Sequence, residues 1–299
     1  GRALLPGPFF STVVLGAHTL LEAGTEEQKK DILPKVARGE RILTLALTEP
    51  SATWEARGVQ LKATARGHDH VLDGTKLFVP DARVADDLIV AARTKDGARP
   101  EEGVSLFLVD AKSPGITCTL LKTIAADKQC EVAFSKVAVP GKNLVGKLNE
   151  GWPVLQKVLQ RAAIAKCAEM VGGAQKVLEM SVDYAKQRVQ FGRPIGSFQA
   201  IQHYCANMVT DVDGARFVTY EAAWRLQEGL PCAKEGSMAK AWTSEAYRRV
   251  TALGHQIHGG IGFTKEHDMQ LYFRRAKAAE LAYGDADFHR ERVAQQMGL

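Results

Sequence analysis

The pattern of hydrophobic and polar positions divides the chain into three parts, and the first part is helical. Residues 9–38 carry apolar side chains at helical spacing. A first predicted helix stops at Gly24. A second begins at Thr25, where Glu and Gln residues follow in the order of a capping box, and it ends near Gly39. We therefore predict that residues 1–40 are the end of a helical N-terminal domain.

The second part has the pattern of short β-strands. Between residues 41 and 147, runs rich in Val, Ile, Leu and Thr alternate with Gly, Pro and Asp. Turn signals at a spacing of about ten residues are typical of antiparallel strands in a sandwich or barrel. The Asp73-Gly74 pair predicts a tight hairpin turn. We predict a middle antiparallel β domain over residues 41–147.

The third part returns to helical periodicity and is expected to be a bundle. Trp224 and Trp242 lie at helical spacing, so we expect them in its core. The fold class is then α+β and multi-domain: the remnant of a helical N-terminal domain, an antiparallel β-barrel or sandwich, and a C-terminal four-helix bundle over residues 148–299. The four long helices are expected over residues 152–190, 198–228, 233–257 and 264–282.

Composition and charge exclude several classes of function. The net charge of +5 is spread along the chain, without the concentrated basic stripe that nucleic acid binding requires. No apolar run approaches the roughly 20 residues of a membrane span, and the first residues do not form a signal peptide. The five cysteines are widely spaced, with no CxxC pair, so neither a metal site nor a disulfide framework is expected. We expect a cytoplasmic protein with no nucleic acid or membrane partner.

Residues 256–263, "QIHGGIGF", are the most glycine-dense stretch of the chain. A dinucleotide-binding motif needs a strand before its glycines, and here a helical pattern precedes them. A P-loop needs a Gly-Lys-Ser/Thr sequence, which is also missing. Two readings remain open: a helix C-cap, where glycine is favoured, or a phosphate-binding loop of another kind.

A second candidate for phosphate binding is "KQRVQFGRPIGSFQAIQ", residues 186–202. Arg188 comes near the end of a long predicted helix, and Phe191-Gly192 followed by Pro194 breaks that helix. An arginine beside the N-terminus of the next helix can bind phosphate oxygens. The alternative is a solvated arginine at a helix corner.

These two stretches, together with "TEP" at residues 48–50, resemble the acyl-CoA dehydrogenase family of flavoproteins. The family's R-x-x-F-G-x-P corner and Q-x-x-G-G-x-G loop hold FAD, and a Thr in its TEP segment hydrogen-bonds the flavin. The resemblance implies FAD as the cofactor. The implied FAD-binding residues are Thr48, Phe78, Arg188, Phe191, Gln199, Gln256, Gly259, Gly260 and Gly262.

The resemblance also implies partners and a reaction. In the family the loop comes from one subunit and the corner from its neighbour, so a homo- or hetero-oligomer, a dimer or tetramer, is expected. The implied reaction is α,β-dehydrogenation of an acyl-CoA substrate, with an electron-transfer flavoprotein as electron acceptor. A carboxylate removes the α-proton while the β-hydride passes to the flavin.

The family's catalytic base does not have its usual side chain here. The Glu of the family's Y-E-G triplet corresponds to Tyr283, and tyrosine, with an ordinary pKa of about 10, is a poor base near neutral pH. A second base position used by some members corresponds to Ala162. Nearby acids are Asp285, Glu280 and Glu169, of which Asp285 ranks first because it follows the glycine of the turn.

Other positions near the flavin also depart from the family pattern, at Trp54, Glu55, Pro80 and Asp287. Two main hypotheses result. The chain is an FAD-dependent acyl-CoA dehydrogenase, either with a displaced base or as one subunit of a hetero-oligomer. Alternatively, it is a catalytically silent subunit that presents FAD to a sister chain. A flavoprotein of the same fold with oxidase or dehydratase chemistry is a third reading.

Overall fold

The computed structural model describes residues 1–299, and the contacts within it divide the chain into two compact units. The first unit comprises residues 6–159 and contains the sheet. The second comprises residues 160–299 together with residues 1–5. Each unit has its own hydrophobic core. The division at residues 40 and 147 that the sequence suggests stays a prediction.

The helical segment of the sheet-containing unit follows the sequence closely. It consists of η1 (Phe10–Ala17), α1 (His18–Ala23) and α2 (Glu26–Ala37). The capping box is confirmed: the Gln28 backbone N donates to Thr25 Oγ1 at 3.2 Å, and the Thr25 backbone N donates to Gln28 Oε1 at 3.0 Å. The backbone N–H groups of the N-cap and of the third helical residue are thus both satisfied.

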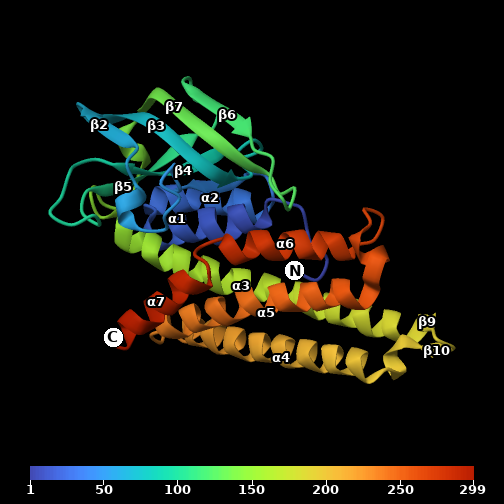
Figure 1. The fold of residues 1–299 in the computed structure, drawn as a ribbon. Helices are drawn as coiled ribbons and strands as arrows, with labels where there is room; N and C mark the ends of the chain where they lie inside the picture. Colours follow the sequence, from blue (N-terminus) through green and yellow to red (C-terminus); the bar gives the residue numbers. More distant parts are fainter. The chain divides into compact units, whose positions relative to one another are not determined.

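Eight strands form one sheet (Figure 1). The strand order is β6-β7-β3-β2-β4-β5-β8. The eighth strand, β1, lies outside this order and pairs with β4. Most neighbours are antiparallel, as expected, but β1 runs parallel to β4, and one residue pair joins β2 to β4 in parallel. The strands are β1 (Leu43–Ala46), β2 (Lys62–Arg66), β3 (Asp69–Pro80), β4 (Asp87–Arg93), β5 (Val104–Asp110), β6 (Ile116–Leu120), β7 (Gln129–Val139) and β8 (Leu144–Val145).

The hairpin predicted at Asp73-Gly74 is wrong. Both residues lie inside β3, where the register against β7 shifts between Leu72 and Gly74. Gly74 has φ +141°, and glycine supplies such a backbone in a β-bulge as readily as in a turn. The actual two-residue turn joins β2 to β3 at residues 67–68, after the pair Arg66↔Asp69.

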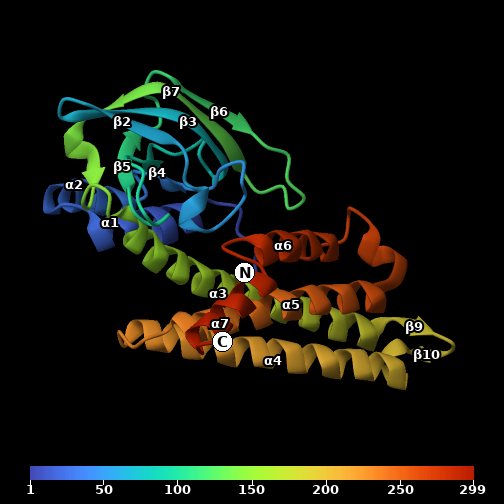
Figure 2. The same ribbon diagram turned by 60° about the vertical axis from the view of Figure 1, so that its left-hand side comes forward.

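The second unit is a bundle of long helices (Figures 1 and 2). The helices are α3 (Gly151–Gln187), α4 (Gln199–Gln227), α5 (Ala233–His258), α6 (Met269–Leu281) and α7 (Ala286–Gln296). Helix α7 was not among the four expected from the sequence. Short elements connect the helices: β9 (Val189–Gln190), β10 (Arg193–Pro194), η4 (Ile195–Ser197) and η5 (Gly259–Phe263). None of the helices is long and apolar enough to cross a membrane.

Two tryptophans of the bundle do not lie where the sequence suggested. Trp224 is 54% exposed and Trp242 is 43% exposed, so the prediction that both lie in the core is wrong. Phe217 and Tyr220, on the same helix as Trp224, are 69% and 62% exposed. The helical spacing of these residues therefore marks a surface of α4, and smaller residues such as Val212, Ala215 and Ala222 face the core.

Candidate functional site

The TEP segment is fixed in the sheet-containing unit through its glutamate. Thr48 is buried directly after β1. Glu49 accepts hydrogen bonds from the backbone N–H groups of Gln60 and Leu61 at 2.9 and 3.0 Å. It also accepts one from Nζ of the fully buried Lys76 at 2.6 Å. These bonds hold the segment against β3, so the position of Thr48 does not depend on a mobile loop.

Phe78 lies on the neighbouring part of β3 in a conformation that few aromatic residues adopt. Leu77 N donates to the carbonyl oxygen of Thr48 at 2.8 Å. The register then shifts between Lys76 and Val79, and Phe78 has φ +53° and is 49% exposed. A left-handed aromatic residue persists only where its surroundings hold it, and such residues gather at ligand sites. Phe78 is therefore presented beside Thr48 as an exposed flat surface.

Some departures from the family pattern in this unit have structural roles. The Pro80 carbonyl accepts a hydrogen bond from the Thr44 hydroxyl at 2.6 Å. Glu55 forms an ion pair with Arg57, with Oε2 and Nε 2.6 Å apart. Neither contact would hold a ligand.

The predicted corner is an exposed hairpin at one end of the bundle. The strands β9 and β10 pair across Phe191, which has φ +53° and is 90% exposed, and Gly192, which has φ +76°. Arg188 and Gln199 are both exposed. The chain supplies no hydrogen-bond or ion-pair partner for the Arg188 guanidinium, so its five donors are available to a ligand or a second chain.

The glycine loop continues directly from α5. Gly259 has φ +61° and ψ −141°, a conformation that only glycine adopts readily. A Cβ at Gly259 or Gly260 would point into open space, and both residues and Gln256 are exposed. Gly262 is buried, and a Cβ there would lie 3.2 Å from Cβ of His258. At Gly259 and Gly260 the loop therefore exposes its backbone with no side chain beside it.

One ring contact joins the corner to the glycine loop. Tyr184, one turn before Arg188, stacks on His258 at the end of α5 with ring centroids 4.5 Å apart. His258 is buried, and its Nδ1 lies 2.8 Å from the carbonyl oxygen of Gly254. Burial lowers the pKa of His258, so it is a neutral packing residue. Both segments lie at the same end of the bundle, as Figures 1 and 2 show.

These observations fit the FAD that the family resemblance implies. An unpaired guanidinium suits a diphosphate, and a backbone edge without Cβ atoms lets an anion approach N–H groups closely. Thr48 and Phe78 supply a hydroxyl and an aromatic face, as the isoalloxazine edge would need. No group of three or more His, Cys, Asp and Glu could hold a metal, and all five cysteines are free.

The turn that corresponds to the family's base lies between α6 and α7. Tyr283 has φ +62° and Gly284 has φ +99°. The Tyr283 carbonyl oxygen lies 3.0 Å from Nε2 of His289. Nζ of the buried Lys240 donates to the carbonyl oxygens of Glu280 at 2.9 Å and Gly284 at 2.8 Å. The side chain at the base position is thus a phenol on a tightly held backbone.

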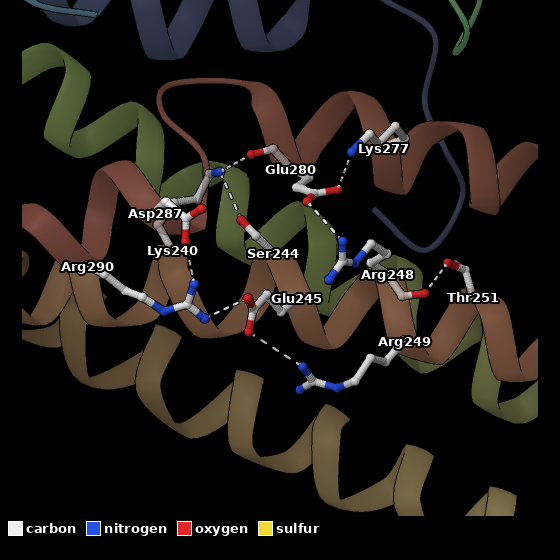
Figure 3. Close-up of polar contacts among 10 residues, drawn as sticks. All are labelled: Lys240, Ser244, Glu245, Arg248, Arg249, Thr251, Lys277, Glu280, Asp287 and Arg290. Carbon is white, nitrogen blue, oxygen red and sulfur yellow. Dashed lines mark hydrogen bonds and ion pairs between the residues drawn. The ribbon is translucent and has the colours of Figure 1, made fainter.

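The two acids nearest Tyr283 are occupied by structural contacts. Asp285 is the N-cap of α7, and its Oδ1 accepts from the Phe288 backbone N at 2.9 Å. Glu280 is buried, with Oε2 3.2 Å from Lys277 Nζ and Oε1 3.7 Å from Arg248 Nη1 (Figure 3). Asp285 and Glu280 are therefore both engaged in contacts that hold this turn and the helices beside it.

The remaining candidate positions on α3 also provide no free carboxylate. Ala162, at the second base position, is fully buried and has no titratable group. Glu169 lies 2.6 Å from Lys166 Nζ and 3.7 Å from an Arg275 nitrogen. The base itself stays unassigned.

Sequence reasoning missed the buried lysines and the histidine that hold these segments. Lys240 and Lys76 are fully buried, and His289 is 6% exposed. A signal for Lys240 was present, because it falls on the buried face of α5 with Thr243, Ser244 and Tyr247. Because lysine is so seldom buried, its residue type argues against a place on this buried face.

Comparison with known proteins identifies the family. The model of the acyl-CoA dehydrogenase middle domain matches residues 44–137, and that of the C-terminal domain matches residues 149–298. Probable acyl-CoA dehydrogenase YngJ of Bacillus subtilis is 36% identical over 292 residues, which cover 97% of this chain and 77% of that protein. The chain belongs to the acyl-CoA dehydrogenase family, and the resemblance inferred from its motifs is confirmed.

A second relative and two solved structures are also similar. The caffeyl-CoA reductase-Etf complex subunit CarC of Acetobacterium woodii is 33% identical and covers 90% of this chain and 72% of its own. Butyryl-CoA dehydrogenase from Megasphaera elsdenii superimposes with a TM-score of 0.93 at 31% identity, over 98% of this chain and 77% of that chain. The FAD complex of PigA gives a TM-score of 0.93 at 25% identity, over 98% and 77%. The predicted α+β fold, with its short helical N-terminal part, is confirmed.

Proposed function

We propose that this chain is an FAD-binding subunit of acyl-CoA dehydrogenase type that lacks a base of its own. The observation that carries this proposal is the turn at Tyr283, where a phenol replaces the carboxylate and both neighbouring acids are occupied. The α,β-dehydrogenation of an acyl-CoA thioester would then use a carboxylate from a sister chain in a hetero-oligomer. In this hetero-oligomer the present chain would bind FAD, the sister chain would supply the base, and the two together would act as the dehydrogenase.

The chain's own residues would bind and orient FAD. The Arg188 guanidinium and the backbone N–H groups of residues 259–262 would hold the diphosphate. The Thr48 hydroxyl would hydrogen-bond the isoalloxazine edge, and Phe78 would cover the ring. When bound, FAD supplies the acceptor for the hydride that leaves the β-carbon. The Tyr283 phenol can donate a hydrogen bond to the substrate, but it cannot take the α-proton effectively near neutral pH.

The surface of α4 supports an assembly of more than one chain. Large apolar side chains gather on this helix and the adjacent α5, and contiguous exposed patches of this kind mark protein interaction sites. Trp242 also stacks under the Arg249 guanidinium, whose carbon lies 5.5 Å from the ring centroid. The exposed residues are Val209, Phe217, Tyr220, Trp224, Met238 and Trp242.

We further propose an electron-transfer flavoprotein as the electron acceptor. The support is the relative CarC, which is a subunit of a caffeyl-CoA reductase-Etf complex. The proposed substrate is a CoA thioester, because the similar proteins are dehydrogenases of acyl-CoA and butyryl-CoA.

The test begins with the purified chain reconstituted with FAD. We expect a flavin spectrum with its band at about 450 nm, and no bleaching when acyl-CoAs are added anaerobically. Bleaching should appear once a sister chain with Glu at the equivalent position is added. Failure to bind FAD, alone or with such a chain, would contradict the proposal. Fast bleaching of the isolated chain would instead favour a displaced base.

A further inference from the structure

The turn between α6 and α7 is held from outside by two buried side chains. Lys240 comes from α5 and donates to the carbonyl oxygens of Glu280 and Gly284, while its third proton goes to Ser244 Oγ at 3.0 Å. His289 comes from α7 and bonds the carbonyl oxygen of Tyr283 at 3.0 Å. Three carbonyl groups within five residues are therefore each satisfied by a side chain. Figure 3 shows Lys240 reaching from α5 toward Glu280.

The backbone that these bonds hold is strained. Tyr283 adopts the left-handed region at φ +62°, which is unfavourable for a residue with a bulky side chain. Gly284 follows at φ +99°, and a Cβ there would lie 2.3 Å from Cδ1 of Phe288. Such conformations persist where the surrounding structure over-determines them, and they gather at active sites.

Stabilisation of a helix end does not account for this arrangement. A lysine at the C-terminus of α6 would satisfy the Glu280 carbonyl and interact favourably with the helix dipole. It would not need to reach Gly284, which lies beyond the helix, nor to be fully buried. Burying an ammonium group against three neutral acceptors is unfavourable, since no acceptor carries a compensating charge. The feature that benefits from all of these contacts is the backbone conformation at residue 283.

We propose that Lys240 and His289 are positioning residues that hold residue 283 in the left-handed conformation from which its side chain meets the substrate. The part of this inference that concerns the substrate rests on the proposed function. The part that concerns the backbone stands on the contacts alone. The clamp is independent of the side chain at position 283, because every bond that it makes to the turn is made to a backbone carbonyl group.

The charge state of Lys240 gives this clamp a pH dependence. Burial lowers the pKa of Lys240 to about 8, against the opposing effects of Cys167, Asp285 and Glu280 and with a further lowering by Lys166. Burial also lowers the pKa of His289 to about 4, helped by Lys240 and Arg292 and opposed by the bond to the Tyr283 carbonyl and by Asp285. Between these values Lys240 offers three protons to its three acceptors. Above pH 8 the neutral amine has only two protons, so one acceptor loses its bond.

Hydrogen exchange of the full FAD-loaded chain tests the clamp directly. In Lys240→Met, amides of residues 282–286 should exchange at least about tenfold faster, while those of α4 keep their protection. Ser244→Ala, which removes the one partner outside the turn, should change exchange there much less. The wild-type turn should also lose protection from pH 7 to 9 after correction for intrinsic exchange. Unchanged exchange in Lys240→Met would overturn the proposal whatever its activity.

A second pair of variants covers the case in which Lys240→Met does not fold. His289→Phe should raise exchange in the same amides, and His289→Gln, which keeps a donor, should restore much of the protection. Equal exchange in the two variants would contradict a positioning role for His289.

A kinetic test separates the clamp from the proposed function. In a Tyr283→Glu background, Lys240→Met should lower kcat with little change in KM, because it misplaces the base without touching binding. If Tyr283→Glu alone shows no activity, the proposed function fails while hydrogen exchange still decides on the clamp. Equal kcat with and without Lys240→Met would contradict the positioning role.

Discussion

Lys76 and Glu49 form a buried ion pair in the sheet-containing unit, with Nζ and Oε1 2.6 Å apart. The ammonium group also donates to the carbonyl oxygen of Leu47 at 3.0 Å, and the carboxylate accepts from the Leu61 backbone N at 3.0 Å. The pair therefore connects the TEP segment, the bulge in β3 and the start of β2. It explains why Glu belongs in this motif although it needs no contact with a ligand.

Replacing Glu49 with Gln should lower the free energy of unfolding by about 3–5 kcal/mol, because it leaves a buried ammonium group without its counter-charge. Denaturant unfolding measures the change. Glu55→Gln is the control, since Glu55 is half exposed and pairs with Arg57 and the Thr53 hydroxyl near the surface. Equal losses in the two variants would show that the buried pair has no special role.

The same lysine should make stability depend on alkaline pH. Burial lowers the pKa of Lys76 to about 8 from its ordinary 10.5, and Glu49 opposes that shift. Between these two values the unfolded chain holds the proton and the folded chain has lost it, so the free energy of unfolding rises with pH in this window. Lys76→Met removes this contribution. The difference in unfolding free energy between Lys76→Met and wild type should therefore change from pH 8 to 10.5, and a constant difference would refute the shift.

Tyr247 carries a hydroxyl group that the protein does not use. The residue is 2% exposed, and its hydroxyl has no hydrogen-bond partner. Tyr247→Phe should therefore raise the free energy of unfolding by about 1 kcal/mol, because an unsatisfied buried polar group is removed. Gly173→Ala should act in the opposite direction, since a Cβ there would lie 2.3 Å from the same hydroxyl. A marked loss of stability in Tyr247→Phe would show that the hydroxyl has a partner.

Asp285 allows its two possible roles to be separated. If Asp285 acts as the N-cap of α7, Asp285→Ala should lower the free energy of unfolding by about 1 kcal/mol. Asp285→Asn should leave it almost unchanged, because Asn caps a helix equally well. If Asp285 were the catalytic base, the assembled enzyme would lose activity in both variants. We expect thermal unfolding to distinguish Ala from Asn, and flavin reduction in the assembled complex to be the same in wild type and Asp285→Asn. Loss of reduction in Asp285→Asn would assign the base to Asp285.

Local sequence signals predict much of this fold. The features that they miss depend on pairing and packing between segments that lie far apart in sequence. Thr25 and Gln28 define a helix start because both groups of the capping box lie within one turn of sequence. The Asp73-Gly74 pair predicts a turn, but a glycine with positive φ suits a turn and a β-bulge equally, and only the pairing of β3 with β7 distinguishes the two. The parallel pairing of β1 with β4 likewise depends on strands that lie far apart in sequence.

In the candidate site, too, local motifs predict some residues but not those whose role depends on tertiary contacts. The motifs located Arg188, Phe191 and the glycine loop, and the structure exposes them at one end of the bundle. Lys240 and His289 carry no motif, because their role comes from reaching backbone carbonyl groups, 40 and 44 residues away for Lys240 and 6 residues away for His289. The sequence predicts a core position for Trp224, because an apolar stripe has the same helical spacing whether it packs inside this chain or lies on its surface.

The decisive prediction concerns residue 283. Tyr283→Glu places a carboxylate on a backbone that Lys240 and His289 already hold, so the variant should gain a base without rebuilding the turn. A positioned general base contributes about 10²–10⁴-fold, and the rate of anaerobic flavin bleaching by acyl-CoA should rise by that order over Tyr283→Gln. Tyr283→Gln is the matched control, because Gln is similar to Glu in size and is also polar but has no basic carboxylate. With FAD bound to both variants, equal bleaching rates would mean that residue 283 does not face the thioester, and the proposed base-free subunit would lose its main support.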